Sequence, residues 1–114
     1  MMKKPDEELS RSLMEYENLE KQLEVLLIQK HQLQLQLNEV KHASDELKKA
    51  KGNVYRQVGS IMVLSDKEEA QKDLKDKEEL ISVKLNAIGK QEEKLRSTVL
   101  ESQKRLQEKM KEHG

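Results

Sequence analysis

The segment that most constrains the fold of this chain is residues 54–65, which read VYRQVGSIMVLS. It lies almost midway between two long, highly charged segments whose apolar residues recur with helical spacing. Val, Tyr and Ile favour strands, and Gly59 followed by Ser60 fits a two-residue hairpin loop. The pattern therefore predicts a helix, a β-hairpin over about 54–64, and a second helix.

The first helix is predicted over about 6–51. Pro5 suits the first helical position, acidic residues follow it, and lysines precede a capping Gly52. With Leu9 at heptad position a, nine of the twelve a and d positions are apolar. These positions are Leu9, Ser12, Tyr16, Leu19, Leu23, Leu26, Lys30, Leu33, Leu37, Val40, Ser44 and Leu47.

The second helix is predicted over about 66–112, beginning at a capping box from Ser65 to Glu68. Its seam is weaker, because seven of the twelve a and d positions are apolar. These positions are Gln71, Leu74, Glu78, Ile81, Leu85, Ile88, Glu92, Leu95, Val99, Ser102, Leu106 and Lys109. Gly89 lies within this helix, either as a flexible point or as an ordinary tolerated glycine.

Two helices of nearly equal length around a tight reversal predict an antiparallel coiled coil. The whole chain, 1–114, is expected to be one mainly α-helical domain. In the register in which facing residue numbers add to about 118, each polar residue of the seam lies opposite an apolar one, so no layer is polar on both sides. Lys30 then faces Ile88, and Glu92 faces Leu26.

The predicted hairpin points to assembly. A two-stranded hairpin is marginal in water, and its open edges favour pairing with other strands. Hairpins from several copies, or from a sister subunit, would satisfy one another by closing a β-barrel between subunits. The assembly residues are predicted to be Val54, Tyr55, Val58, Gly59, Ile61, Val63 and Leu64. The alternative is a short irregular loop that happens to be apolar.

Composition excludes several classes of function. Charged residues make up 39% of the chain, but both signs alternate and the net charge is zero, which disfavours nucleic-acid binding. There is no cysteine, no apolar run long enough to cross a membrane, and no secretory signal, so we expect a cytoplasmic protein. The three histidines have no metal-ligand spacing. We expect neither an enzyme nor a bound cofactor or metal.

Four stretches together resemble the β-type subunits of the prefoldin family. They are LEKQLEVLLIQKHQLQLQLNEV, the hairpin VYRQVGSIMVLS, DKEEAQKDLKDKEEL and the later QEEKL. The resemblance covers nearly the whole chain, and a single hairpin between the helices is typical of the β type rather than the α type.

The resemblance implies an ATP-independent chaperone subunit in a hexamer of two α-type and four β-type subunits. Hairpins would form the base, and coiled-coil tips would hold non-native polypeptides and transfer them to a group II chaperonin. The tip lies at both chain ends, so the client-binding residues are expected to be Met1, Met2, Leu9, Leu13, Met14, Leu100, Leu106 and Met110. Methionine suits this role because its side chain adapts to many shapes.

Other interpretations remain open at this point. The terminal apolar residues could simply continue the coil, and Leu27, Ile28 and Leu35, which lie off the seam, could contact neighbouring subunits or line the cavity. The chain could also be a scaffolding coiled coil that docks one folded partner. A helical RNA-binding arm is disfavoured because no helix face gathers basic residues.

Overall fold

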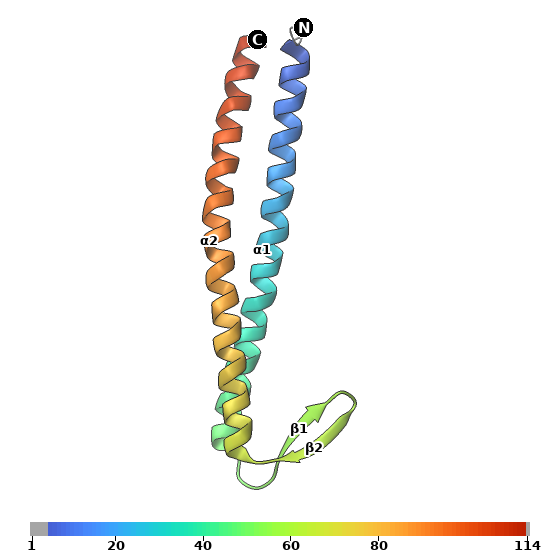
Figure 1. The fold of residues 1–114 in the computed structure, drawn as a ribbon, viewed down its shortest axis with the longest axis vertical. Helices are drawn as coiled ribbons and strands as arrows, with labels where there is room; N and C mark the ends of the chain where they lie inside the picture. The colour runs from blue at the N-terminus through green and yellow to red at the C-terminus, as the bar shows by residue number, and fades with distance from the viewer. Residues whose placement is uncertain (1–4, 114) are drawn as a thin grey trace. The chain divides into compact units, whose positions relative to one another are not determined.

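The computed structural model describes residues 5–113, and its order of elements is the predicted one (Figure 1). Helix α1 (Pro5–Lys49) is followed by strands β1 (Val54–Val58) and β2 (Ile61–Ser65) and then by helix α2 (Lys67–His113). The chain forms two compact units. We call residues 1–30 with 87–114 the terminal unit, and residues 31–86 the hairpin unit.

The heptad pattern predicts which side of each helix is covered. All twelve predicted seam positions of α1, and all twelve of α2, are buried or half-buried. Among the described side chains of α1, Leu27 is the one other residue that is not exposed. The most buried apolar side chains are Leu26 and Leu106 in the terminal unit and Leu47 and Ile81 in the hairpin unit. Alternating steps of three and four residues produce this result, because they keep one face of each helix turned toward the other.

The end of α1 lies two residues before the predicted one. The helix stops at Lys49, and the Ala50 amide donates to the Leu47 carbonyl over 3.2 Å in a tightened last turn. Gly52 then adopts a φ of 104°, which reverses the chain direction at little steric cost because glycine has no Cβ.

The predicted cap of α2 at Ser65 is wrong. Ser65 is the last residue of β2, where it pairs with Val54, and α2 begins two residues later. The side chain of Asp66 takes the capping role, since its Oδ1 accepts a hydrogen bond from the Glu68 amide over 3.4 Å. Because Ser65 is paired with Val54 in the sheet, it does not act as the N-cap of α2.

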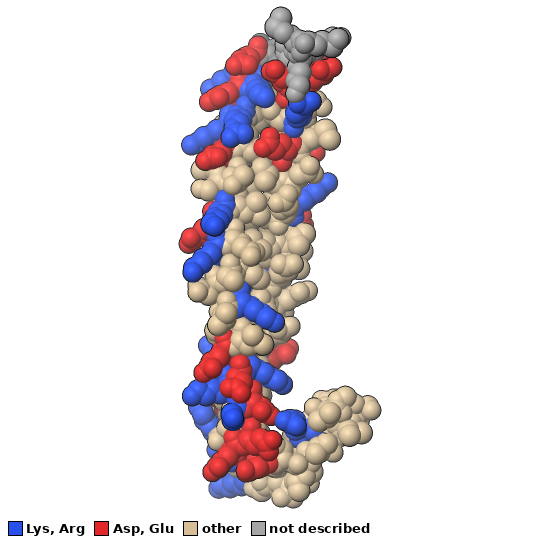
Figure 2. Space-filling view, viewed as in Figure 1, with Lys and Arg blue, Asp and Glu red and all other residues tan. Residues whose placement is uncertain are grey.

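The hairpin itself is as predicted. Its strands pair antiparallel from Val54 with Ser65 to Val58 with Ile61, leaving Gly59 and Ser60 as the two-residue loop. Gly59 has a φ of 62° whereas Ser60 has no positive φ, which is the pattern of a type II′ turn. In Figure 2 the projecting hairpin is largely free of charged side chains, in contrast to the charged helices from which it extends.

The terminal unit contains a polar contact that the sequence analysis did not predict. Lys30 and Glu92 were each expected to face an apolar residue, in adjacent layers of the seam, and Lys30 Nζ lies 2.9 Å from Glu92 Oε1. Arg96 Nε donates to the other carboxylate oxygen of Glu92, also over 2.9 Å. The hydrogen bond from Lys30, and then that from Arg96, hold the pKa of Glu92 below its ordinary value. Long polar side chains thus reach one another across neighbouring layers of the seam.

Candidate functional site

The hairpin presents an open apolar surface. We call its exposed apolar side chains the hairpin surface: Tyr55, Val58, Ile61, Met62, Val63 and Leu64. Five of these were predicted as assembly residues. Met62 was missed, although its position between Ile61 and Val63 in an apolar strand was a sufficient signal. Val54, which was also predicted, is half-buried at the start of β1.

Both faces of the hairpin contribute to this surface. Successive strand residues point to opposite faces, so the pairs Val58–Ile61 and Tyr55–Leu64 lie on different sides of the sheet. The sheet has only two strands among the described residues, which leaves one edge of β1 and one edge of β2 unpaired. A hairpin with two apolar faces and two free edges is suited to addition of further strands.

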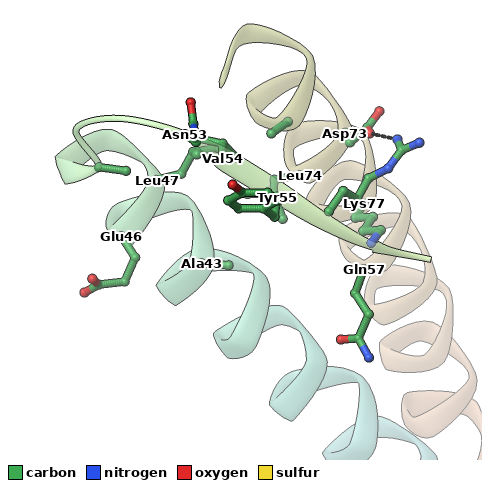
Figure 3. Close-up of a pocket in the computed structure, with 13 residues that line it drawn as sticks. Ala43, Glu46, Leu47, Asn53, Val54, Tyr55, Gln57, Asp73, Leu74 and Lys77 are labelled. Carbon is green, nitrogen blue, oxygen red and sulfur yellow. Dashed lines mark hydrogen bonds and ion pairs between the residues drawn. The ribbon is translucent and has the colours of Figure 1, made fainter. Parts of the chain in front are cut away.

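The root of the hairpin is tethered to α2. Arg56 Nη1 lies 2.6 Å from Asp73 Oδ2, and this ion pair joins β1 to the second turn of α2 (Figure 3). Beside it, Tyr55 lies between the last turns of α1 and the first turns of α2 (Figure 3). The ion pair therefore links β1 to α2 within the hairpin unit.

A cavity of about 490 Å³ opens at this root, between the two helices and β1. Its apolar lining comes from the ring of Tyr55 and from short or aliphatic side chains, namely Ala43, Leu47, Ala50, Val54, Ala70 and Leu74. Nearby, Lys67 Nζ donates to the carbonyls of Lys48 and Ala50 over 3.3 Å each. These bonds satisfy acceptors that the end of α1 leaves open, and they hold the entry and exit of the hairpin together.

The second candidate site is formed by the outer ends of both helices, in the terminal unit. Leu13, Met14, Leu100 and Met110 are exposed there, whereas Leu9 is half-buried. Leu106 is only 8% exposed, so it belongs to the seam and presents little surface. Met1 and Met2 lie outside the described residues.

The seam at these helix ends is polar for a coiled coil. Ser12 and Ser102 occupy core positions and are 7% and 4% exposed. A serine at such a position buries far less apolar area than a leucine, which would contribute roughly 1.5–3 kcal/mol on full burial. The ends of the helices therefore combine a weak core with exposed flexible apolar side chains.

Of the off-seam residues, Leu27 is half-buried, whereas Ile28 and Leu35 are exposed. The structure also exposes Val25, Leu80 and Val83, which sequence reasoning did not single out. A search of the outward heptad positions for apolar residues would have found them.

The described residues contain no group of three or more His, Cys, Asp or Glu side chains placed to hold a metal ion. Within the same range, neither helix has a stretch apolar enough to cross a bilayer.

Comparison with known proteins shows which family this chain resembles in sequence and in structure. Residues 10–113 match the family model described as prefoldin subunit. The chain is 36% identical over 93 residues to the prefoldin subunit beta of Pyrococcus furiosus, covering 80% of each chain. It is 32% identical over 103 residues to that of Methanosarcina acetivorans, covering 89% of this chain and 88% of the relative.

A solved structure agrees with these matches. The crystal structure of the prefoldin beta subunit from Thermococcus strain KS-1 superposes with a TM-score of 0.84 at 33% sequence identity. The superposition covers 94% of this chain and 96% of that one. The resemblance inferred from the four sequence stretches is thereby confirmed.

Proposed function

Because the chain belongs to the prefoldin family of chaperones as a β-type subunit, we propose that it is part of an ATP-independent holdase. The holdase captures non-native polypeptides at the ends of its helices and passes them to a group II chaperonin. One observation carries this proposal: the chain exposes apolar side chains both on the hairpin and at the helix ends. The first surface serves assembly and the second serves client capture.

Assembly involves α-type subunits, because membership of the β type implies a heteromeric prefoldin complex. We expect a hexamer of two α-type and four β-type subunits, in the cytoplasm, with hairpins closing a barrel. The hairpin surface supports this expectation, since burial of six apolar side chains against neighbouring subunits would supply a large driving force. The whole chain acts as one domain in this assembly.

Client capture depends on weak, repeated contacts. Leu13, Met14, Leu100 and Met110 are exposed on the terminal unit, and the methionine side chains adapt to many client shapes. Several such ends on one hexamer bind the same unfolded chain with a raised effective concentration, so individual contacts remain weak and reversible. Release to a chaperonin then requires no nucleotide-driven step in this subunit.

The test is a pair of charge substitutions with a matched control. Met14→Glu combined with Leu100→Glu should weaken suppression of client aggregation, because a charged side chain must be desolvated to contact an apolar client. Val83→Glu is the control, since Val83 is an exposed apolar residue of the hairpin unit. Aggregation is followed by light scattering of a chemically denatured client diluted into complexes of verified mass.

We expect the double variant to assemble normally and to lose most of the suppression, while Val83→Glu retains it. Full suppression by the double variant, in complexes of normal mass, would show that the helix ends do not bind clients.

A further inference from the structure

The cavity at the root of the hairpin lies along the free edge of β1. Val54, Tyr55, Arg56 and Gln57 line it, and none of the residues described for β2 does. These four residues alternate between the two faces of the sheet, so the cavity lies beside the strand rather than under one face. The residues that line it all belong to the hairpin unit. The two edges of the hairpin therefore differ, because only the edge of β1 borders a cavity.

The backbone groups that β1 offers to a further strand belong to residues at this cavity. Val58 and Ile61 flank the two-residue loop, and a turn of this type closes on a hydrogen bond between its flanking residues. Hydrogen-bonded and non-hydrogen-bonded pairs then alternate along an antiparallel ladder. The N–H and C=O groups of Tyr55 and Gln57 therefore point away from β2, toward the place that an added strand would take.

The corresponding outward groups on the other edge are those of Met62 and Leu64. Both side chains are exposed, at 64% and 63%, and both lie on one face of the sheet. Strand β2 has no charged residue, whereas β1 carries Arg56, so a second β1 would bring like charges together at the cavity. Strand β2 of another copy is therefore better suited to the edge of β1.

One antiparallel register matches all of these outward groups. It places Leu64 of a second copy opposite Tyr55, and Met62 of that copy opposite Gln57, as hydrogen-bonded pairs. Directly opposite residues share a face of the sheet, and Tyr55 lies between the two helices (Figure 3). Leu64 of the second copy then also points between the helices, into the cavity.

The cavity fits a leucine side chain in size. A missing leucine side chain leaves a cavity of roughly 150 Å³ in a protein core, and the volume here is about 490 Å³. Two alanines, Ala43 on α1 and Ala70 on α2, keep this space open, and Leu47 and Leu74 add apolar walls. The incoming leucine would therefore exchange water for apolar contacts on several sides.

The charges around the cavity favour an uncharged occupant. Arg56 and Asp73 neutralise each other in their ion pair. The other two charged residues of the lining, Glu46 and Lys77, carry opposite charges and are exposed to solvent. The lining thus has no net charge, which matches the uncharged strand β2.

We propose that β2 of a second copy of this chain pairs with the free edge of β1 and inserts its Leu64 side chain into the root cavity. The contact is head-to-tail, because each copy offers a cavity on one edge and a leucine on the other, and such contacts form rings when the rotation closes. The inference rests on the proposed function, since it identifies the edges and side chains that the assembly uses.

The first test is a size exchange in the full chain, measured by sedimentation velocity over a concentration series. Ala70→Leu fills part of the cavity and should weaken self-association on the order of tenfold, because the incoming leucine no longer fits. Leu64→Ala should weaken it similarly by leaving the cavity unfilled. The chain with both changes should regain most of the association. Ala87→Leu, at an exposed alanine of α2 outside the cavity, is the control and should have no effect.

Disulfide trapping tests the register, and the chain has no cysteine of its own to interfere. A chain carrying Gln57→Cys, mixed with one carrying Met62→Cys, should form a mixed disulfide dimer, because the two positions face each other between copies. Val63→Cys replaces Met62→Cys in the control, since its side chain points to the other face of the sheet. Non-reducing electrophoresis measures the dimer, and circular dichroism verifies that each variant is folded.

Three results would overturn the proposal: a chain that stays monomeric at every concentration, a doubly substituted chain that associates no better than Ala70→Leu alone, or equal trapping at positions 62 and 63. If the same variants still form complexes of normal mass with an α-type subunit, assembly uses other edges and the proposed function stands. Failure of the proposed function is seen separately, as client aggregation that wild-type complexes do not suppress.

Discussion

At the scale of single residues, the ion pair between Lys30 and Glu92 makes the stability of the terminal unit depend on pH. The pKa of Glu92 is lowered, first by the hydrogen bond from Lys30 and then by that from Arg96. Because the folded state lowers this pKa, the unfolded state binds the proton more readily. The stabilisation is therefore present above the ordinary pKa of 4.5 and is lost as the pH falls through the lower folded value.

We expect Glu92→Gln to lower the urea midpoint of unfolding at pH 7 and to have a smaller effect at pH 3. Glu93→Gln, an exposed neighbour, is the control and should change little at either pH. Urea titrations followed by circular dichroism measure both. A gap between wild type and Glu92→Gln that is equally large at the two pH values would contradict the assigned role of the carboxylate.

Gly89 gives a second prediction at this scale. It lies inside α2 without a positive φ, and a Cβ placed there meets nothing within 4 Å. Gly89→Ala should therefore raise the free energy of unfolding by about 0.5–1 kcal/mol, because alanine loses less backbone entropy in a helix. Gly52→Ala should have the opposite effect, since Gly52 has a φ of 104°. Thermal unfolding compares the two, and destabilisation by Gly89→Ala would indicate that the glycine is needed for a bend.

At the scale of elements, the hairpin exposes six apolar side chains that the chain by itself does not bury. Val58→Asp or Ile61→Asp should block formation of the complex with an α-type subunit, because each places a carboxylate on the open apolar face of the sheet. Helical content should change little, since neither residue lies in a helix. Multi-angle light scattering of the mixed subunits measures the mass.

Ser60→Asp in the hairpin loop is the control, because it adds the same charge outside the strands. Complexes of normal mass from Val58→Asp and Ile61→Asp would refute the assembly role of the hairpin surface.

At the scale of the whole molecule, assembly and client capture are expected to be separable. Removal of residues 1–14 and 100–114 deletes Leu13, Met14, Leu100 and Met110 but leaves the hairpin unit intact. We expect such a truncated subunit to form complexes of the normal subunit number with an α-type partner and to lose suppression of client aggregation. Light scattering reports both quantities, and undiminished suppression by complete complexes would place client binding elsewhere.

The element order and the seam were predictable from the sequence because both depend on short-range periodicity. Each of the twenty-four seam positions is covered as the heptads predict, and the turn at Gly59 follows from the need for a positive φ. The exposed hairpin surface was predictable for the same reason, since alternation in a strand and the absence of charge are local features. The client-binding role of the helix ends stays a prediction.

Only the tertiary structure decided contacts between residues that are distant in sequence. The Lys30–Glu92 ion pair depends on how far two long side chains extend across the seam. The Arg56–Asp73 ion pair depends on where β1 lies relative to α2. The N-cap of α2 is Asp66 rather than the predicted Ser65, because Ser65 is paired with Val54 in the hairpin. Periodicity determines which face of an element is buried, whereas the partners across that face depend on register and side-chain length, which no local pattern contains.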